Sequence, residues 1–170
     1  MTRRFPPFAC LLSLALAGCA SLNPASPPLT VVVLRHAEKA VDDPKDPSLS
    51  DAGRARAERV ADTLADAPLR ATYATAYRRT RATAAPAAGR HGIAVATYDA
   101  AMPAAEFAAT LRRTHPDGTV LVVGHSNTAP AIAAALCACP VAPMREDEFD
   151  RWMEIRIGPD GVASLRERRY

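Results

Sequence analysis

The chain has 170 residues, of which 49% are hydrophobic and 23% are charged, and its formal net charge is +3. This length allows a single domain with a hydrophobic core. Two of the positive charges, Arg3 and Arg4, belong to the extreme N-terminus, so the rest of the chain is close to neutral and we predict no nucleic-acid partner.

The first residues have the pattern of an export signal. Arg3 and Arg4 precede an apolar run of about ten residues, which is too short to span a membrane, since a spanning helix needs roughly 20. The Leu-Ala-Gly-Cys that ends at Cys19 resembles the bacterial lipobox, which implies cleavage before Cys19 and lipid on this residue. An ordinary secretory signal with an incidental cysteine is the alternative.

We therefore predict three segments. Residues 1–18 are a lipoprotein signal peptide, residues 19–29 are a lipidated tether rich in proline and small residues, and residues 30–170 are the domain. The expected location is the periplasmic face of a bacterial membrane, with lipidated Cys19 as the membrane anchor.

The domain alternates between apolar runs and helical patterns. We predict strands over residues 30–34, 70–75, 93–98 and 119–123 and helices after Ser50, over 80–90, from Pro103 and over 127–138. Residues 151–157 and 162–168 flank a Gly-Pro-Asp-Gly turn and predict a C-terminal hairpin on the sheet. Four strand-helix repeats indicate an α/β three-layer sandwich, with a largely parallel central sheet flanked by helices.

Cys137 and Cys139 are the two cysteines of the domain. A single residue lies between them, which makes a disulfide strained, and nearby residues do not supply the further ligands that zinc needs. Two free thiols near a helix end are the favoured interpretation, and an oxidised pair is the alternative.

Polar side chains follow each of the four predicted strands. Arg35 and His36 follow the first, Arg78 and Arg79 the second, Asp99 the third, and a Gly-His-Ser-Asn segment containing His125 the fourth. Each group alone has an ordinary explanation, such as solvated surface or a helix cap. Together they predict one crevice at the carboxyl ends of the strands, where open α/β sheets bind ligands. Arginine suits phosphate oxygens, and histidine can act as a nucleophile.

Several short motifs resemble the histidine phosphatase superfamily, also called the phosphoglycerate mutase-like fold. They are Leu-Arg-His-Ala-Glu at 34–38, Leu-Ser-Asp-Ala-Gly at 49–53, Arg-Thr-Arg-Ala-Thr-Ala at 79–84 and Gly-His-Ser at 124–126. The resemblance covers roughly residues 30–135. It implies a phosphomonoester hydrolase without metal or other cofactor, in which His36 is transiently phosphorylated while Arg35, Arg79 and His125 bind the phosphoryl group. The expected substrate is a phosphorylated small molecule or another exported phosphoester.

The proton donor for the leaving group is the least determined residue. The resemblance favours Asp99, directly after the third strand, as the catalytic acid; Glu106, Glu38, solvent or no donor are the alternatives. The chain departs from the family pattern at Thr75 and Tyr77, which we expect to lie outside the phosphoryl pocket. It has little room for inserted segments, so we also expect an open pocket.

Three other functions compete with this interpretation. Ser126 lies in a sequence that begins like the nucleophile elbow of a serine hydrolase, but no histidine follows it, as that fold's order of residues requires. A phosphomutase would have to shield its intermediate from water, which an open, exported site does not favour. The third alternative is a binding protein, namely a lipoprotein of the same fold that binds a phosphate ligand with weak turnover.

Overall fold

The structure is a computed structural model that describes residues 1–2 and 27–170. Most of the predicted signal peptide, the predicted lipid site Cys19 and most of the tether lie outside the described residues and stay predictions. In the described part of the chain, no helix is long and apolar enough to cross a membrane.

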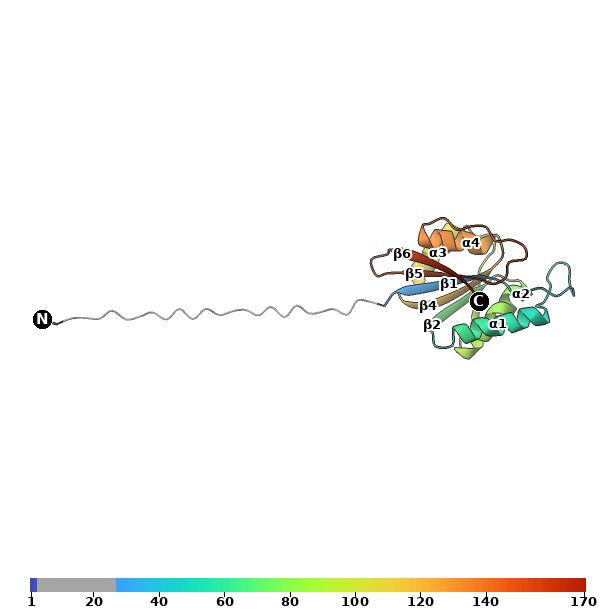
Figure 1. The fold of residues 1–170 in the computed structure, drawn as a ribbon, viewed down its shortest axis with the longest axis horizontal. Helices are drawn as coiled ribbons and strands as arrows, with labels where there is room; N and C mark the ends of the chain where they lie inside the picture. Colours follow the sequence, from blue (N-terminus) through green and yellow to red (C-terminus); the bar gives the residue numbers. More distant parts are fainter. Residues whose placement is uncertain (3–26) are drawn as a thin grey trace.

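A six-stranded mixed sheet forms the centre of the domain (Figure 1). Its strands are β1 (Leu29–Arg35), β2 (Leu69–Ala74), β3 (Val95–Thr97), β4 (Gly118–Gly124), β5 (Arg151–Ile157) and β6 (Ala163–Arg169). The spatial order is β3-β2-β4-β1-β5-β6. The first four strands are parallel, and the hairpin of β5 and β6 joins the sheet antiparallel to β1. The predicted fold class and C-terminal hairpin are confirmed.

Helices cover both faces of the sheet, which gives the three layers visible in Figure 1. They are α1 (Asp51–Thr63), α2 (Arg78–Arg90), α3 (Ala104–Thr114) and α4 (Thr128–Cys137). The residues of β1 show how one strand serves both layers. Val31 and Val33 belong to the core under α3 and α4, whereas Val32 and Leu34 belong to the core under α1 and α2. A strand buried on both faces reads as a continuous apolar run, as it does here.

The element boundaries differ from expectation in a few places. β3 is only three residues long, shorter than the predicted 93–98, and α2 begins two residues before the predicted start at residue 80. Cys137 and Cys139 are joined by a disulfide across Ala138, so the favoured prediction of free thiols is wrong. Ala138 ends α4 in the left-handed region (φ 52°), and this turn brings the cysteine Cα atoms to 5.1 Å. A disulfide is feasible at that separation.

Candidate active site

The carboxyl ends of β1 and β4 are adjacent, and they bring the two predicted histidines together. The amide of His36 donates a hydrogen bond to the carbonyl of Gly124 (3.0 Å), and the rings of His36 and His125 lie 5.5 Å apart in an edge-on arrangement. A pocket of about 350 Å³ opens here. It is lined by Arg35, His36, Lys39, Tyr77, Arg79, Ala100, His125, Ser126, Asn127, Thr128 and Glu146. Four of the five residues for which we predicted a role in chemistry therefore share one pocket.

His36 is buried, with 3% of its surface exposed, and its ring is fixed by one hydrogen bond. Nδ1 lies 2.8 Å from the carbonyl oxygen of Ala37. Because a carbonyl can only accept, Nδ1 carries the proton and Nε2 keeps its lone pair. Burial lowers the pKa of His36 to about 3, and the charges of Arg79 and Arg35 act in the same direction. His36 is therefore neutral near pH 7, the form that can attack as a nucleophile.

His125 is held by a chain of two threonine hydroxyls. Its Nε2 lies 3.0 Å from Oγ1 of Thr75, which lies 2.8 Å from Oγ1 of Thr80. The hydroxyl of Thr80 donates to the carbonyl of Tyr77 (2.8 Å), so it accepts from Thr75. Thr75 has then used its proton, and Nε2 of His125 must donate to it.

With the proton of His125 on Nε2, its Nδ1 carries a lone pair and makes no hydrogen bond to any described residue. Burial lowers the pKa of His125 to about 4, with Arg79 and Arg35 as further causes. The expectation that Tyr77 lies outside the pocket is wrong, whereas Thr75 does not line the pocket. Thr75 orients His125, while the Tyr77 ring lies 5.2 Å from the His125 ring and lines the pocket.

Arg35 is almost fully buried, yet it keeps an unused donor. Its Nη1 donates to the carbonyl oxygens of Arg145 (2.9 Å), Glu146 (2.9 Å) and Glu148 (3.1 Å). The guanidinium carbon lies 4.2 Å from the centre of the Phe149 ring. Nε of Arg35 is buried and has no hydrogen-bond partner among the described residues.

Arg79 is also short of partners. Its guanidinium lies over the Tyr77 ring, 4.3 Å from the ring centre, and its Nη1 is 3.6 Å from a carboxylate oxygen of Asp46, beyond hydrogen-bond distance. Both Nε and Nη1 of Arg79 are buried without a hydrogen bond in the described part of the chain. Buried guanidinium donors are costly to leave unpaired, so two such groups in one pocket are suited to an anion with several oxygens.

The connector from α4 to β5, residues 138–150, covers one side of this pocket. Its carbonyls bind Arg35, Phe149 stacks on that guanidinium, and Glu146 lines the opening. Buried Glu148 binds Arg151 (2.7 Å) and accepts from the amide of Arg145 (3.2 Å), which shapes the connector. This short connector therefore bounds the pocket on one side, in the place of a large inserted segment. Sequence reasoning missed these residues, since the connector carries no motif or periodic pattern.

The three carboxylates that the sequence offered as proton donor lie outside the pocket or are bound elsewhere. Asp99 is exposed, accepts a hydrogen bond from the amide of Ala101 (2.9 Å) and does not line the pocket, contrary to expectation. Glu106 is exposed on α3 and also lies outside the lining. Arg56 binds both oxygens of Glu38 and lowers its pKa, so Glu38 is engaged away from the imidazole of His36.

Glu146 is the carboxylate that lines the pocket. One of its oxygens lies 3.1 Å from Nη2 of Arg35, and the other accepts from the hydroxyl of Ser126 (3.0 Å). Its side chain is 83% exposed. Ser126 thus hydrogen-bonds to a carboxylate and not to a histidine, so the serine–histidine pair of a serine hydrolase is not formed.

The Leu-Ser-x-x-Gly segment positions the loop that follows His36. Ser50 caps α1 by accepting from the amide of Gly53 (3.1 Å), and its own amide donates to the carbonyl of Glu38 (3.0 Å). A Cβ atom on Gly53 would lie 2.3 Å from that same carbonyl oxygen. Glycine is needed because the helix packs directly on the loop backbone.

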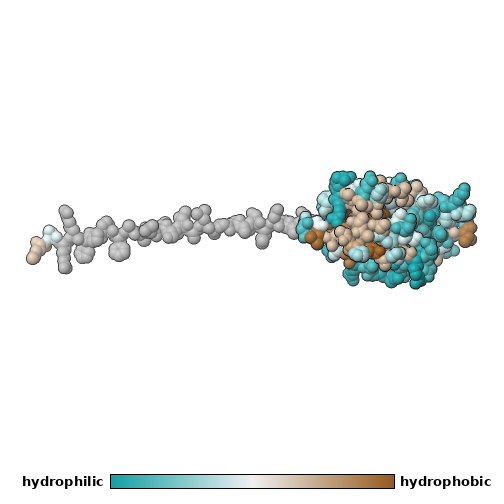
Figure 2. All heavy atoms as spheres, turned by 90° about the horizontal axis from the view of Figure 1, so that it is seen from above, coloured by the Kyte–Doolittle hydropathy of each residue, from teal (hydrophilic) through white to brown (hydrophobic). Residues whose placement is uncertain are grey.

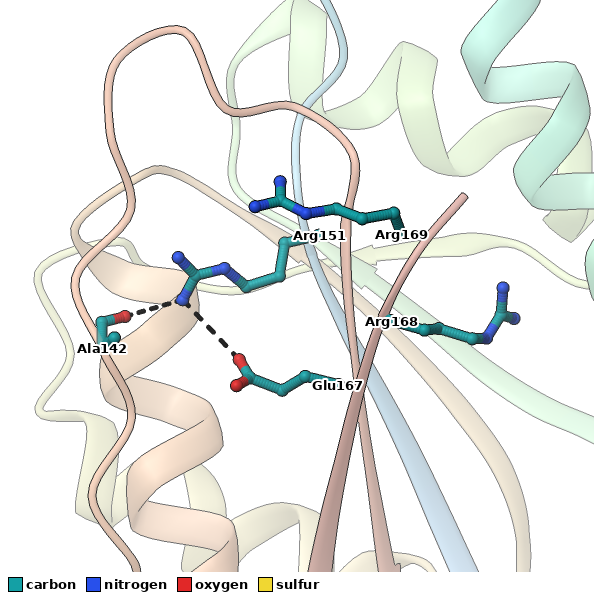
Figure 3. Close-up of a pocket in the computed structure, with 5 residues that line it drawn as sticks. All are labelled: Ala142, Arg151, Glu167, Arg168 and Arg169. Atoms are coloured by element: carbon teal, nitrogen blue, oxygen red, sulfur yellow. Dashed lines mark hydrogen bonds and ion pairs between the residues drawn. The ribbon is translucent and has the colours of Figure 1, made fainter.

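A second polar pocket lies on β5 and β6, and Figure 3 shows its lining of Ala142, Arg151, Glu167, Arg168 and Arg169. Its arginines are already engaged. Arg151 binds Glu148 and the carbonyl of Ala142, and it forms an ion pair with Glu167. Arg168 lies over the Trp152 ring. Among the described residues, no group of three or more His, Cys, Asp or Glu side chains is placed to hold a metal ion.

Comparisons with known proteins agree with the motifs and the fold. Residues 31–102 match the sequence model of the histidine phosphatase superfamily (branch 1). A search of curated proteins found no match. Two solved structures that share the fold are the protein histidine phosphatase SixA with tungstate and a mycobacterial glucosyl-3-phosphoglycerate phosphatase.

The SixA structure has a TM-score of 0.66 and 16% sequence identity, over 82% of this chain and 96% of that one. The mycobacterial structure has a TM-score of 0.63 and 18% identity, over 83% of this chain and 97% of that one. At these identities the likeness shows the fold alone. The matched segment contains Arg35, His36 and Arg79. The match to the histidine phosphatase superfamily therefore holds for residues 31–102, and the solved structures show that the whole domain shares their fold.

Proposed function

We propose that this protein is a metal-independent phosphomonoester hydrolase that works through a phosphohistidine on His36. The observation that carries the proposal is the set of unpaired, buried guanidinium donors of Arg35 and Arg79 around a neutral, oriented imidazole. A transferring phosphoryl group spreads negative charge over its equatorial oxygens, so catalysis needs mainly positioning and fixed positive charge.

The reaction has two steps. In the first, Nε2 of His36 forms a bond to phosphorus, the P–O ester bond breaks, and the leaving oxygen takes a proton. In the second, the oxygen of a water molecule bonds to phosphorus and the P–N bond breaks, while the proton lost by the water returns to the group that protonated the leaving oxygen; inorganic phosphate is released and the imidazole is restored. Arg35 and Arg79 bind the phosphoryl oxygens in both steps. The negative charge of the bound group raises the pKa of His125, so that Nδ1 can be protonated and donate to it.

For the proton donor we propose Glu146 in place of Asp99, since Glu146 is the carboxylate in the lining of the pocket. In this role the carboxyl group of Glu146 would give its proton to the leaving oxygen of a phosphoester bound at Arg35. Asp99 remains the alternative, because its neighbour Ala100 does line the pocket.

The nucleophile is tested by trapping the intermediate. Purified protein quenched in alkali during turnover of a ³²P-labelled phosphoester should carry label that is stable to alkali and lost in acid. His36→Ala should lose both the label and phosphate release, and EDTA should change neither in the wild type. A label stable to hot acid, or a fully active His36→Ala protein, would falsify the assignment.

The proton donor is tested with a pair of substrates. Glu146→Gln should reduce hydrolysis of an alkyl phosphate by about 100-fold and that of 4-nitrophenyl phosphate much less, because nitrophenolate departs without a proton. Asp99→Asn is the matched comparison and should affect neither substrate. The reverse pattern would return the role to Asp99, and equal losses on both substrates would indicate a binding role.

Two alternatives remain within the same fold. A lipoprotein that binds a phosphate ligand with weak turnover would bind inorganic phosphate but release none from a panel of phosphoesters. A phosphomutase would pass the label from His36 to an added alcohol acceptor instead of water. We favour hydrolysis, because the pocket opens to solvent at the largely exposed Glu146.

We also propose that lipid on Cys19 anchors the protein at the periplasmic face of a bacterial membrane, where exported phosphoesters would be the substrates. The Leu-Ala-Gly-Cys motif supports lipidation at Cys19. Lipid there would hold the protein at the membrane, because an acyl chain contributes about 0.8 kcal/mol per buried methylene. A Cys19→Ala variant should leave the membrane fraction on cell fractionation. Membrane retention of this variant in high salt would contradict the anchor.

A further inference from the structure

A small hollow adjoins the pocket of the active site, and we call it the annex. Its volume is about 110 Å³, and its apolar walls include Tyr98, Phe107, Ala131 and Ile132, from the loop after β3 and from helices α3 and α4. Three further residues, Ala100, Asn127 and Thr128, line both the annex and the active-site pocket. The two spaces therefore lie next to each other and share one wall.

The annex walls are packed and mostly apolar. The rings of Tyr98 and Phe107 stack with their centres 4.3 Å apart and an angle of 11° between their planes. Ile132 is 2% exposed and belongs to the core. The surface over α3 and α4 is weakly hydrophobic and framed by hydrophilic residues (Figure 2). Such walls favour an apolar group over a sugar or a charged peptide.

Tyr98, which lines the annex, carries a buried hydroxyl. The hydroxyl of Tyr98 lies beside Thr128, but it makes no hydrogen bond of ordinary geometry with any described residue. It lies near the end of β4, because a Cβ atom on Gly124 would be 2.8 Å from it and 2.6 Å from Oγ1 of Thr128. Gly124 directly precedes His125, so this hydroxyl is close to the site of the chemistry.

The volume limits what the annex can hold. An apolar cavity of about 150 Å³ accommodates benzene, so a hollow of about 110 Å³ that is open on one side fits a single ring or a short branched alkyl group. It has no room for a hexose or a folded protein surface. A phosphoryl group held by Arg35 and Arg79 would carry its ester substituent past the shared residues into this space.

We propose that the annex binds the organic group of the substrate, and that this group is a single aromatic ring or a branched alkyl group of similar size. The proposal rests on the proposed function, since it needs a phosphoester bound at His36. In this proposal, residues outside the phosphoryl pocket select the substrate. Ala131 and Ile132 on α4 and Phe107 on α3 would make the main contacts with its organic group.

Benzyl phosphate and glycerol 1-phosphate are the test pair, because both leaving groups are primary alcohols while only the first is apolar. The wild type should have at least tenfold higher kcat/KM for benzyl phosphate. Ala131→Leu fills the annex from an exposed position on α4, and the ratio of the two kcat/KM values should fall about tenfold or more. Ala105→Leu, an equal change at an exposed position of α3 outside the annex, should leave the ratio unchanged.

Binding of phenylphosphonate and methylphosphonate, measured by calorimetry, gives a readout that does not need turnover. The wild type should bind phenylphosphonate more tightly, and Ala131→Leu should lose that preference. Hydrolysis of both esters with equal kcat/KM in all three proteins would overturn the annex proposal and leave the proposed function intact. Failure to hydrolyse any ester, with the phenylphosphonate preference retained, would instead overturn the proposed function and keep the annex as a ligand site.

Discussion

Replacing Thr75 by valine tests whether the hydroxyl chain behind His125 positions the second histidine. Valine has nearly the shape of threonine but no hydroxyl, so it removes the acceptor that lies 3.0 Å from Nε2 of His125. Thr75 is 1% exposed, so water has little access to replace the lost group. The variant leaves an N–H of His125 unpaired and deprives the Thr80 hydroxyl of a donor.

The expected magnitude follows from these two losses. An unsatisfied buried polar group costs about 1–3 kcal/mol, which is the expected fall in the free energy of unfolding. If His125 instead swings away to find water, the same energy is lost from binding of the transition state. Since about 1.4 kcal/mol corresponds to a factor of ten, kcat/KM should fall between about fivefold and about 150-fold.

Two assays and a control separate positioning from general damage. Urea denaturation gives the stability, and phosphate release gives kcat/KM. ¹⁵N NMR of the imidazole reports the tautomer, which should be Nε2–H for His125 in the wild type and mixed in Thr75→Val. Thr75→Ser keeps the hydroxyl and should retain the tautomer and most of the activity. A Thr75→Val protein with activity within twofold of the wild type and an unchanged tautomer would refute the reasoning.

Three further predictions concern stability. Because the pKa values of His36 and His125 are lowered to about 3 and about 4, the unfolded chain binds more protons than the folded one below about pH 6.5. The free energy of unfolding should therefore fall by roughly 5 kcal/mol between pH 6.5 and 4, with a little under 3 kcal/mol from each histidine, and urea denaturation of a His36→Gln, His125→Gln protein should show a weaker dependence. Gly53→Ala should lower the melting temperature strongly because its Cβ would meet the Glu38 carbonyl at 2.3 Å, whereas Gly89→Ala on α2, with nothing within 4 Å, should be neutral or raise it. Reduction of the Cys137–Cys139 disulfide should cost only about 1–2 kcal/mol, because the closed loop is so short, and should leave kcat unchanged in a phosphate-release assay with and without dithiothreitol.

The parts of the site that the sequence predicted lie at the ends of buried strands. Leu34 and Val123 mark two apolar runs whose ends are easy to locate, and the polar residues that follow them must meet at one edge of a parallel sheet. Arg35, His36 and His125 are therefore placed by topology together with the motifs. Arg79 is placed by the start of α2.

The prediction for Asp99 failed to account for the alternation of side chains along an extended chain. Tyr98 continues the pairing of β3, since its amide donates to the carbonyl of Ala74 (3.0 Å), and its side chain is buried in the core. Successive side chains of an extended segment point to opposite sides, so Asp99 points outward and is exposed. Distance along the sequence from the end of a strand did not determine the direction of the side chain.

The connector that covers Arg35 was beyond prediction for a different reason. Residues 138–150 have no regular secondary structure apart from short turns, so neither helical nor strand periodicity applies to them. They reach the pocket because the carbonyls of residues 145, 146 and 148 bind one guanidinium group that is more than 100 positions earlier in the chain. Only the tertiary structure reveals such contacts.

The same connector contributes to the burial of the nucleophile, since the Phe149 ring lies 6.1 Å from the ring of His36. A histidine is a good nucleophile when it is neutral, and desolvation is the largest cause of the lowered pKa of His36. Covering the site with apolar residues alone would bury the charge of Arg35 without compensation, which is costly. The connector instead supplies carbonyl oxygens to one edge of Arg35 and the face of Phe149 to its plane. It leaves Nε unpaired and places only the exposed carboxylate of Glu146 at Nη2. The guanidinium is thereby stabilised, while its remaining donors stay available for an anion that can displace a solvated carboxylate.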